Sequence, residues 1–414
     1  MKYDQVLIRF GDLMLKGKNR RTFISLTTSL IKQNIKDLNI PIIKTHDRVY
    51  LKLEDISPEV IKERLLRVSG LNSFSFVKVT DHDMNNIINA SIMLINEEIK
   101  EETTFKIYTK RAYKQFPLTS LELTKEVAPS ILKGIETKLK IDVKNPKETL
   151  YIEIREEATY IYLKKIKGIG GFPVGVGGKA TLLLSGGIDS PVSAYLAMKQ
   201  GLYLEGIHFE STPMTSIESV QKVIDISKKL ALYTPKHEFV VLMVSFGKIH
   251  KEILTHIPDP YVITIMRRAM FKIAEKLSNE RGALALVTGE SIGQVASQTL
   301  ESINAIEDVV KIPILRPLLT YDKQEIIDIS VKIDTFGISI RPFEDCCSVY
   351  VPLAPTTKPS IKKCVQYENY IENLDALIEE AVIETKIWVI EPTSDINLSL
   401  LGFEMTEVWE SIQK

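Results

Sequence analysis

The chain has 414 residues, of which 44% are hydrophobic and 26% charged, as in ordinary globular proteins, and it is long enough for about three domains. No apolar run approaches the ~18 residues of a membrane span and no signal peptide opens the chain, so we expect a cytoplasmic protein without a membrane partner. The three cysteines, Cys346, Cys347 and Cys364, exclude a disulfide framework and suit a reducing compartment.

The formal charge is zero overall but is unevenly distributed along the chain. Residues 1–180 hold 31 basic and 22 acidic residues, a net charge of +9, and residues 181–414 carry the balancing −9. This asymmetry favours a front half that binds a polyanion, although solvated charge alone would produce the same imbalance.

Residues 1–75 alternate short strands and helices, which predicts a small α+β domain, for which a ferredoxin-like fold is a candidate. The expected elements are strands over 5–10 and 48–53 and helices over 22–37 and 57–68. A basic turn between the first strand and helix contains Lys16, Lys18 and Arg20. These residues suit contacts with phosphate, or they form an ordinary solvated turn.

Residues 76–167 repeat the mixed pattern, with a helix over 85–99, a strand over 104–109, and a hairpin over 150–155 and 158–163. Basic and aromatic residues are interleaved after the strand, among them Lys110, Arg111 and Lys114. Such a mixture serves RNA through phosphate contacts and stacking, or it is ordinary packing at a strand edge.

A glycine-rich stretch over 168–180 marks a boundary and is expected to be a linker. Its last six residues, 175–180, match a dinucleotide-binding fingerprint. We reject that interpretation because the stretch precedes a strand instead of following one.

Beyond residue 180, strands and helices alternate, which predicts a doubly wound parallel sheet with its ligand beyond the carboxyl ends of the strands. The expected strands cover 181–184, 204–209, 239–244, 283–287 and 312–315, and the expected helices cover 191–201, 217–232 and 261–277.

The sequence SGGIDS at 185–190 lies between the first of these strands and a helix. Ser190 is a good N-cap, and a glycine turn before a helix aims free backbone amides at one point, as in phosphate sites. The loop has no phosphate-loop lysine and carries Asp189 instead, which suits a polyphosphate mainly through a bridging Mg2+. The alternative is a tight turn without a ligand.

Several residues fall at the same edge of the predicted sheet, beyond the strand ends. Strand-end residues could bracket a nucleobase, although His208 is more simply a partly buried strand-end histidine. The set comprises Leu183, Leu184, His208, Phe209, Arg267, Gly289 and Gln298.

SGGIDS resembles the loop of the PP-loop ATP pyrophosphatases, and five further motifs resemble the tRNA 4-thiouridine synthetases, the ThiI family. These motifs are GDLMLKGKNRR (11–21), GIGGFPVGVGGK (168–179), TGESIGQVASQTL (288–300), ILRPLLTYDKQEI (314–326) and RPFEDCC (341–347). The resemblance implies a ferredoxin-like domain over 1–75, a THUMP tRNA-binding domain over 76–167, a linker over 168–180, and a PP-loop domain with a helical C-terminal extension over 181–414.

The resemblance also implies an activity: ATP adenylates O4 of a uridine at position eight of tRNA, and sulfur from a protein persulfide replaces the oxygen. The loop residues Ser185, Gly187 and Ser190 would hold phosphates, with Asp189 at the metal. The residues at the edge of the sheet, named above, match the family's ATP contacts. Lys323 matches the family's essential lysine, and Cys346 matches its catalytic cysteine. The implied cofactors are ATP and Mg2+, and the implied partners are tRNA, a cysteine desulfurase and a second subunit in a homodimer.

The sequence departs from the family at Asp12, where glutamate is commoner. We also expect the protein to be a form without the rhodanese-like domain of some members, to which a role in thiamine biosynthesis is linked. Two alternatives remain open. The first is another PP-loop tRNA-modifying enzyme that uses a nitrogen nucleophile, as a lysidine synthetase does. The second is a non-catalytic tRNA-binding module.

Overall fold

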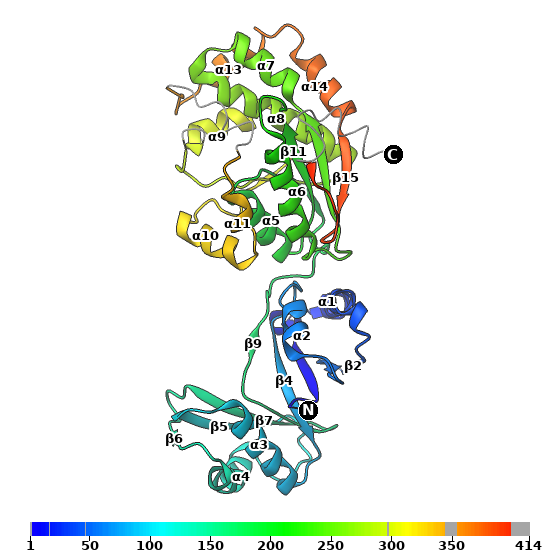
Figure 1. Ribbon diagram of the computed structural model, residues 1–414, viewed down its shortest axis with the longest axis vertical. Helices are drawn as coiled ribbons and strands as arrows, with labels where there is room; N and C mark the ends of the chain where they lie inside the picture. Colours follow the sequence, from blue (N-terminus) through cyan, green and yellow to red (C-terminus); the bar gives the residue numbers. More distant parts are fainter. Residues whose placement is uncertain (1, 16, 46, 296–297, 344–353, 399–414) are drawn as a thin grey trace. The chain divides into compact units, whose positions relative to one another are not determined.

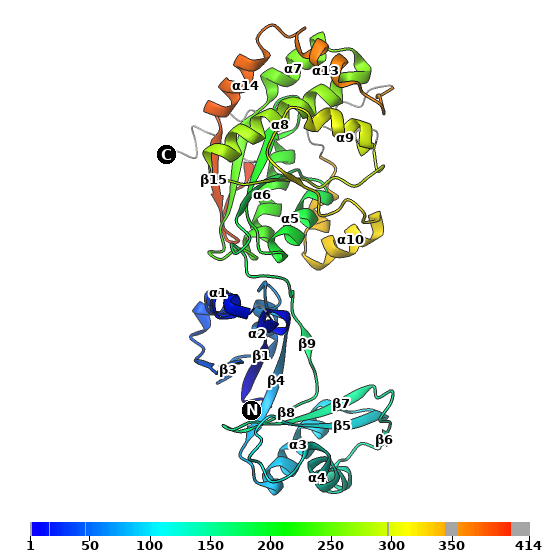
Figure 2. The ribbon, with the colours of Figure 1, turned by 180° about the vertical axis from the view of Figure 1, so that it is seen from behind.

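The computed structural model describes residues 2–15, 17–45, 47–295, 298–343 and 354–398. The chain divides into two compact units, Met1–Phe172 and Pro173–Lys414, and each is described by itself (Figures 1 and 2). Over the described ranges, every helix is too short or too polar to span a bilayer.

Unit 1 is built on a nine-stranded sheet with the order β2-β3-β1-β4-β8-β7-β5-β6, and β9 pairs with β4 off this path. The strands are β1 (Gln5–Arg9), β2 (Ile42–Lys44), β3 (Val49–Lys52), β4 (Ser73–Thr80), β5 (Thr103–Arg111), β6 (Leu139–Ile141), β7 (Glu148–Ile154), β8 (Thr159–Tyr162) and β9 (Ile166–Lys167). The helices are α1 (Arg20–Asn34), α2 (Pro58–Leu65), α3 (Met84–Glu98) and α4 (Ser120–Gly134), with short 3-10 turns η1 (Gly11–Leu15), η2 (Gly17–Asn19) and η3 (Lys36–Leu38).

Strand β4 belongs to both halves of this sheet. Residues 73–77 pair with β1, whereas residues 78–80 pair with β8. The boundary expected between residues 75 and 76 therefore falls inside a strand whose two ends serve different partners.

The four helices cover one face of the sheet. Apolar residues of α1 and α2 pack on β1, β3 and β4, and those of α3 and α4 pack on β5, β7 and β8. Because side chains alternate along a strand, a second cluster forms on the opposite face. It consists of Leu7, Tyr50, Val77, Tyr160 and Tyr162.

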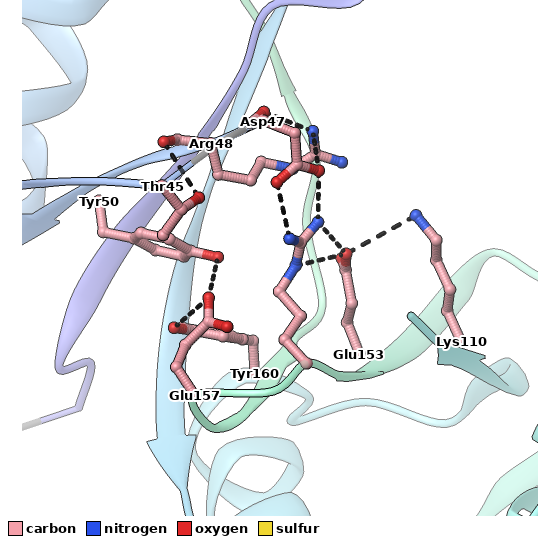
Figure 3. Close-up of polar contacts among 9 residues, drawn as sticks. Thr45, Asp47, Arg48, Tyr50, Lys110, Glu153, Glu157 and Tyr160 are labelled. Atoms are coloured by element: carbon pink, nitrogen blue, oxygen red, sulfur yellow. Dashed lines mark hydrogen bonds and ion pairs between the residues drawn. The ribbon is translucent and has the colours of Figure 1, made fainter. Parts of the chain in front are cut away.

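A charge network centred on the buried side chains of Arg155 and Glu153 joins the segment before β3 to the turn after β7 (Figure 3). The guanidinium of Arg155 donates to both carboxylate oxygens of Asp47 at 3.0 Å and, through Nε, to Glu153 at 2.9 Å. Lys110 Nζ lies 3.6 Å from the same Glu153 oxygen. Burial alone would raise the pKa of Glu153, but the cations Arg155, Lys110 and Arg48 outweigh it and hold that pKa below its usual value.

Unit 2 contains a six-stranded sheet with the order β14-β13-β10-β11-β12-β15. The strands are β10 (Lys179–Leu183), β11 (Tyr203–Glu210), β12 (Phe239–Ser245), β13 (Leu286–Val287), β14 (Ile314–Leu315) and β15 (Lys386–Ile390). Its helices are α5 (Asp189–Lys199), α6 (Ile217–Ala231), α7 (Gly247–His256), α8 (Val262–Glu280), α9 (Leu300–Glu307), α10 (Lys323–Lys332), α11 (Phe336–Ser339), α13 (Ile361–Glu368) and α14 (Leu374–Ile383), with a 3-10 turn η4 (Asp259–Tyr261).

The predicted doubly wound parallel sheet is confirmed for β10 to β14. Helices α5 and α6 pack on one face and α7, α8 and α14 on the other, as Figure 1 shows. The chain runs outward from β10 in both directions, to β11 and β12 on one side and to β13 and β14 on the other. In sheets of this kind, ligands bind beyond the carboxyl ends of the strands at such a switch point.

The C-terminal part was expected to be helical, and this expectation is incomplete. Helix α14 is followed by β15, which pairs antiparallel with β12 at the edge of the sheet. Side chains alternate between the two faces of this edge strand. Trp388 and Ile390 are therefore buried against the sheet's core, whereas Val389 between them is half exposed.

We predict that Arg155→Met destabilises unit 1 at neutral pH by about 3 kcal/mol, because it leaves the buried Glu153 carboxylate without its main partner. Glu153 has a lowered pKa in the folded state, so its stabilising contribution is present above the ordinary glutamate pKa of about 4 and is lost as the pH falls below it. Hydrogen exchange of β7 and β8 amides should therefore show a difference between variant and wild type that shrinks in acid.

The matched control is Arg64→Met, which breaks the exposed pair between Arg64 and Asp37. Exposed pairs contribute about 0–1 kcal/mol, so this variant should stay close to wild type. Equal protection in the two variants would contradict the structural importance of the Arg155 network.

Candidate functional site

Hydrogen bonds between Ser185 and Ser190 join the two ends of the loop after β10. Ser190 Oγ accepts from the backbone N–H of Ser185 at 3.0 Å and donates to the carbonyl of the same residue at 3.0 Å. Helix α5 begins at Asp189 with Ile188 at the N-cap position, so the expectation that Ser190 caps the helix is wrong. Its hydroxyl is used to close the loop, and the Gly187 N–H donates to Ser185 Oγ at 3.3 Å, so the loop is held by its own side chains at the start of α5.

Asp189 is brought together with Lys323, 134 residues later in the chain. The Lys323 ammonium, on the first residue of α10, lies 2.7 Å from Asp189 Oδ1. Gln294 donates to the other carboxylate oxygen at 3.4 Å. The start of α10 is fixed by a capping box between Asp322 and Glu325, which orients Lys323 toward the loop.

Gly289 packs against the same loop from the turn after β13. A Cβ placed on Gly289 would lie 2.8 Å from Ser190 N and 2.9 Å from the carbonyl carbon of Asp189. Both are backbone atoms that cannot move aside without shifting the start of α5. This close approach requires a glycine.

Leu183, Leu184, His208 and Phe209 lie at the carboxyl ends of β10 and β11, as expected. Leu184, His208 and Phe209 are buried and Leu183 is partly exposed. His208 Nδ1 is 3.1 Å from the Leu184 carbonyl oxygen. The imidazole therefore bridges the two strand ends, in agreement with the simpler interpretation of a buried strand-end histidine.

Arg267, on α8, pairs with a buried carboxylate that the sequence interpretation missed. Glu290 contacts the Arg267 guanidinium, accepts from Arg316 Nε at 2.7 Å, and accepts from the Thr288 hydroxyl at 2.9 Å. Burial would raise the pKa of Glu290, but Arg267 and Arg316 hold it below its usual value. Glu290 and Arg316 stand in the quoted motifs, but nothing in the sequence indicates that both are buried.

Gln298 lies in the loop before α9, and its side-chain Oε1 is buried without a hydrogen-bond partner in the part of the chain that the structure describes. A buried carbonyl oxygen that lacks a donor is costly, and such an atom beside a site is suited to a ligand's N–H.

Of the three cysteines, only Cys364 lies in the described ranges; Cys346 and Cys347 lie outside them, as does Lys16. Cys364, on α13, is fully buried, and burial raises the pKa of its thiol. A buried thiol with a raised pKa is a poor nucleophile, so Cys364 is unsuited to carry sulfur.

The basic residues predicted for RNA in the second half of unit 1 are divided between two faces. Lys110 and Arg111 are consecutive in β5 and point to opposite sides of the sheet. Lys110 is on the open face without helices, whereas Arg111 donates to the Phe116 carbonyl at 3.2 Å beside the start of α4. Lys114 is exposed in the following loop.

Two further residues that were predicted to contact phosphate lie in the basic turn near the start of unit 1. Lys18 is exposed in η2, and Arg20 is half-buried at the first position of α1. They belong to a different part of the unit from the open face.

The open face of the sheet combines stacked tyrosines with cations. Tyr151 stacks on Tyr162 with ring centroids 4.9 Å apart, and the 45% exposed Tyr108 meets Tyr151 edge-on. Lys165 Nζ lies 3.9 Å from the Tyr151 ring and the Arg9 guanidinium 4.8 Å from the Tyr162 ring. The sequence analysis missed Arg9 and Lys165, because they join Lys110 only through the pairing of β1, β4, β8, β7 and β5.

Three family models match successive parts of the chain. They are the ThiI ferredoxin-like domain over residues 5–75, the THUMP domain over residues 81–164, and "Thiamine biosynthesis protein (ThiI)" over residues 175–373.

Curated relatives match over almost the whole length. A probable tRNA sulfurtransferase of Acholeplasma laidlawii is 48% identical over 406 residues, which cover 98% of each chain. A probable tRNA sulfurtransferase of Bacillus pumilus is 45% identical over 390 residues, 94% of this chain and 96% of the relative.

Among solved structures, the chain is similar to a 4-thiouridine synthetase in complex with RNA and bound ATP, with a TM-score of 0.84 and 35% identity over 94% of this chain and 100% of that one. PH1313 from Pyrococcus horikoshii shares the fold at a TM-score of 0.61 and 22% identity, over 80% of this chain and 99% of that one. The order of the three domains and the identity along nearly the full length show that the chain belongs to the ThiI family of tRNA sulfurtransferases.

Proposed function

We propose that the protein uses ATP to replace the O4 oxygen of a uridine in tRNA, at position eight, with sulfur, giving 4-thiouridine. The observation that carries this proposal is the convergence of Asp189, Lys323 and Gly289 on the loop at the start of α5. These residues come from three distant parts of the sequence, and they meet at the start of α5, where the N-terminal end of a helix suits phosphates.

Two observations support a nucleotide at this place. Gly289 packs directly against the backbone of Asp189 and Ser190, so the turn after β13 lies at the phosphate loop, and the buried Gln298 Oε1 lacks a donor among the described residues. In adenylation the uridine O4 attacks the α-phosphorus and pyrophosphate leaves. Lys323 and the N-terminal end of α5 would stabilise charge that develops on the phosphate oxygens.

Asp189 supplies one of the ligands that a Mg2+ ion would need. Among the residues that the structure describes, no group of three or more His, Cys, Asp or Glu side chains forms a metal cage. Mg2+ commonly takes one or two protein carboxylates, with the substrate's phosphates and waters as its other ligands, and Asp189 supplies one carboxylate. The ion would neutralise phosphate charge, and Lys323 holds the carboxylate in place.

Adenylation makes the O4 oxygen part of a good leaving group, AMP. The terminal sulfur of a persulfide on Cys346 then attacks C4, the C4–O4 bond breaks, and AMP leaves with the oxygen. A second thiol cleaves the remaining S–S bond and becomes part of a disulfide, which an external thiol reduces. Since Cys364 is buried, Cys346 and Cys347 are the candidates for these two roles.

We place tRNA on the open face of unit 1, where exposed cations accompany stacked tyrosines. Lys106, on β5, lies with its Nζ 5.9 Å from the Tyr108 ring on this face. Phosphates would meet Lys106, Lys110 and Lys165, and bases or riboses would meet Tyr108 and Tyr151. We further propose a cytoplasmic homodimer that receives its sulfur from a cysteine desulfurase.

Gly289→Ala should weaken ATP binding about tenfold or more, because an added Cβ overpacks backbone atoms of the loop at a cost of about 1–3 kcal/mol. Calorimetry with ATP and tRNA-dependent pyrophosphate release both report on this loss. The control is Gly247→Ala, whose Cβ would meet only the Thr212 carbonyl oxygen at 3.7 Å, an ordinary contact. Unchanged ATP affinity in the Gly289 variant would remove this turn from the nucleotide site.

Cys346→Ala should abolish 4-thiouridine while ATP binding and pyrophosphate release persist. The measurement is nucleoside mass spectrometry of tRNA thiolated in vitro and of tRNA from cells that carry the variant. The control is Cys364→Ala, which should thiolate tRNA if the protein tolerates the small cavity. Normal 4-thiouridine from the Cys346 variant would disprove its catalytic role.

Replacing Lys106, Lys110 and Lys165 together by glutamine should weaken tRNA binding and flatten its dependence on salt. Each lost phosphate contact lowers the slope of log K against log salt by about 0.7–0.9. The charge-matched control replaces Lys125, Lys133 and Lys138, which are exposed on α4 and just after it, on the helical side. An equal loss in the two triple variants would mean that net charge, and not the open face, determines binding.

A further inference from the structure

The turn after β13 is hydrogen-bonded to the elements on both sides of it. The Ser193 hydroxyl, on α5, donates to the Thr288 carbonyl at 2.7 Å. The Ser291 hydroxyl donates to the Tyr321 carbonyl, just before α10, at 3.2 Å. The backbone of Glu290 is therefore fixed between the helix that follows the phosphate loop and the helix that begins with the loop's lysine partner.

The Glu290 carboxylate is divided between two arginines. One of its oxygens accepts from Arg316 Nε at 2.7 Å and from the Thr288 hydroxyl at 2.9 Å, and the other contacts Arg267 Nη2. The side chain is 4% exposed. A buried carboxylate with three charge-assisted or hydroxyl partners has little freedom to move, so it holds the Arg267 guanidinium in one orientation.

The Arg267 guanidinium is thus held beside the phosphate loop. Its partner Glu290 directly follows Gly289, which packs on the backbone of Asp189 and Ser190. The donors of a guanidinium lie in one rigid plane that matches phosphate oxygens, so a carboxylate that fixes this plane fixes the direction of every donor. We propose that Glu290 is a positioning residue for ATP: by fixing the Arg267 guanidinium, it directs a cation at the phosphates. This inference rests on the proposed binding of ATP at the loop.

A second buried carboxylate of unit 2 provides a matched control at the other end of α8. Glu205, on β11, is also 4% exposed. It accepts from Nε and Nη2 of Arg281, which directly follows α8, at 2.8 Å each, and it pairs with Lys179 at 2.8 Å. Lys179 is the first residue of β10, so this network lies at the amino ends of the strands, away from the phosphate loop. We expect Glu205 to contribute to stability without affecting ATP.

The test is a double-mutant cycle on ATP affinity, measured by calorimetry with Glu290→Gln, Arg267→Met and the double variant. Glutamine keeps the shape of the glutamate side chain and removes its charge. Glu290→Gln should weaken ATP binding about tenfold in the otherwise wild-type protein, because the guanidinium loses its charged anchor. It should weaken ATP binding less than about twofold when Arg267→Met is already present. A carboxylate with a purely structural role would weaken ATP binding by the same factor in both backgrounds.

The control variant Glu205→Gln should bind ATP as the wild-type protein does, although it also removes a buried negative charge from between two cations. If Glu290→Gln does not fold, as judged by its thermal unfolding, Glu290→Asp replaces it in the cycle. Aspartate keeps the charge but is one methylene shorter, so it cannot hold Arg316 and Arg267 together. The same loss of effect in the Arg267→Met background is expected.

Three results would overturn the inference while ATP binding by the wild-type protein leaves the proposed function intact. They are wild-type ATP affinity in the Glu290 variant, equal losses in the two backgrounds, and an equal loss in Glu205→Gln. Absence of ATP binding by the wild-type protein would instead overturn the proposed function, and the inference with it. The two failures are thus read from different proteins.

Discussion

The contact between Asp189 and Lys323 is the interaction on which the nucleotide site depends. A carboxylate at the start of α5 would repel a polyphosphate that the loop amides attract. The lysine 134 residues later offsets that charge at 2.7 Å, and it reaches the loop because α10 is capped with its first residue facing Asp189. The two residues meet because of the strand order. After β12 the chain crosses to the opposite side of β10 and forms β13 and β14 there, and this brings the following helix α10 back to the loop.

Much of unit 2 could be predicted because its signals are local. Buried strands appear as short apolar runs, and the glycine turn before a helix predicts a phosphate loop. Helix α4 was missed although Thr119 and Glu122 form a capping box, a signal present in the sequence; Pro129 inside the helix argues against the pattern. It could also have been inferred from the sequence that Lys110 and Arg111 point to opposite faces of the sheet, because side chains alternate along a strand.

The remaining features depend on tertiary packing. Glu205 and Glu290 are charged residues, which are ordinarily exposed, and only the fold shows that each is buried among partners. Ser190 has the ideal chemistry for an N-cap, yet its hydroxyl hydrogen-bonds to Ser185 because the loop folds back on itself. At the functional loop, local preference and the three-dimensional arrangement differ, as expected where a site imposes its own geometry.

Strand β4 also limits where unit 1 can be cut into two parts and which of its parts can be exchanged between relatives. A cut after residue 75 would separate Phe76 and Val77 from their partners Val6 and Gln5 on β1, and would leave both edges open. Residues 78–80 would stay with β8. Open strand edges pair readily with other chains, so each half alone would tend to aggregate. The ferredoxin-like and THUMP halves therefore form one folding module, and exchange of either half between relatives would succeed only if the replacement supplied an equivalent of β4.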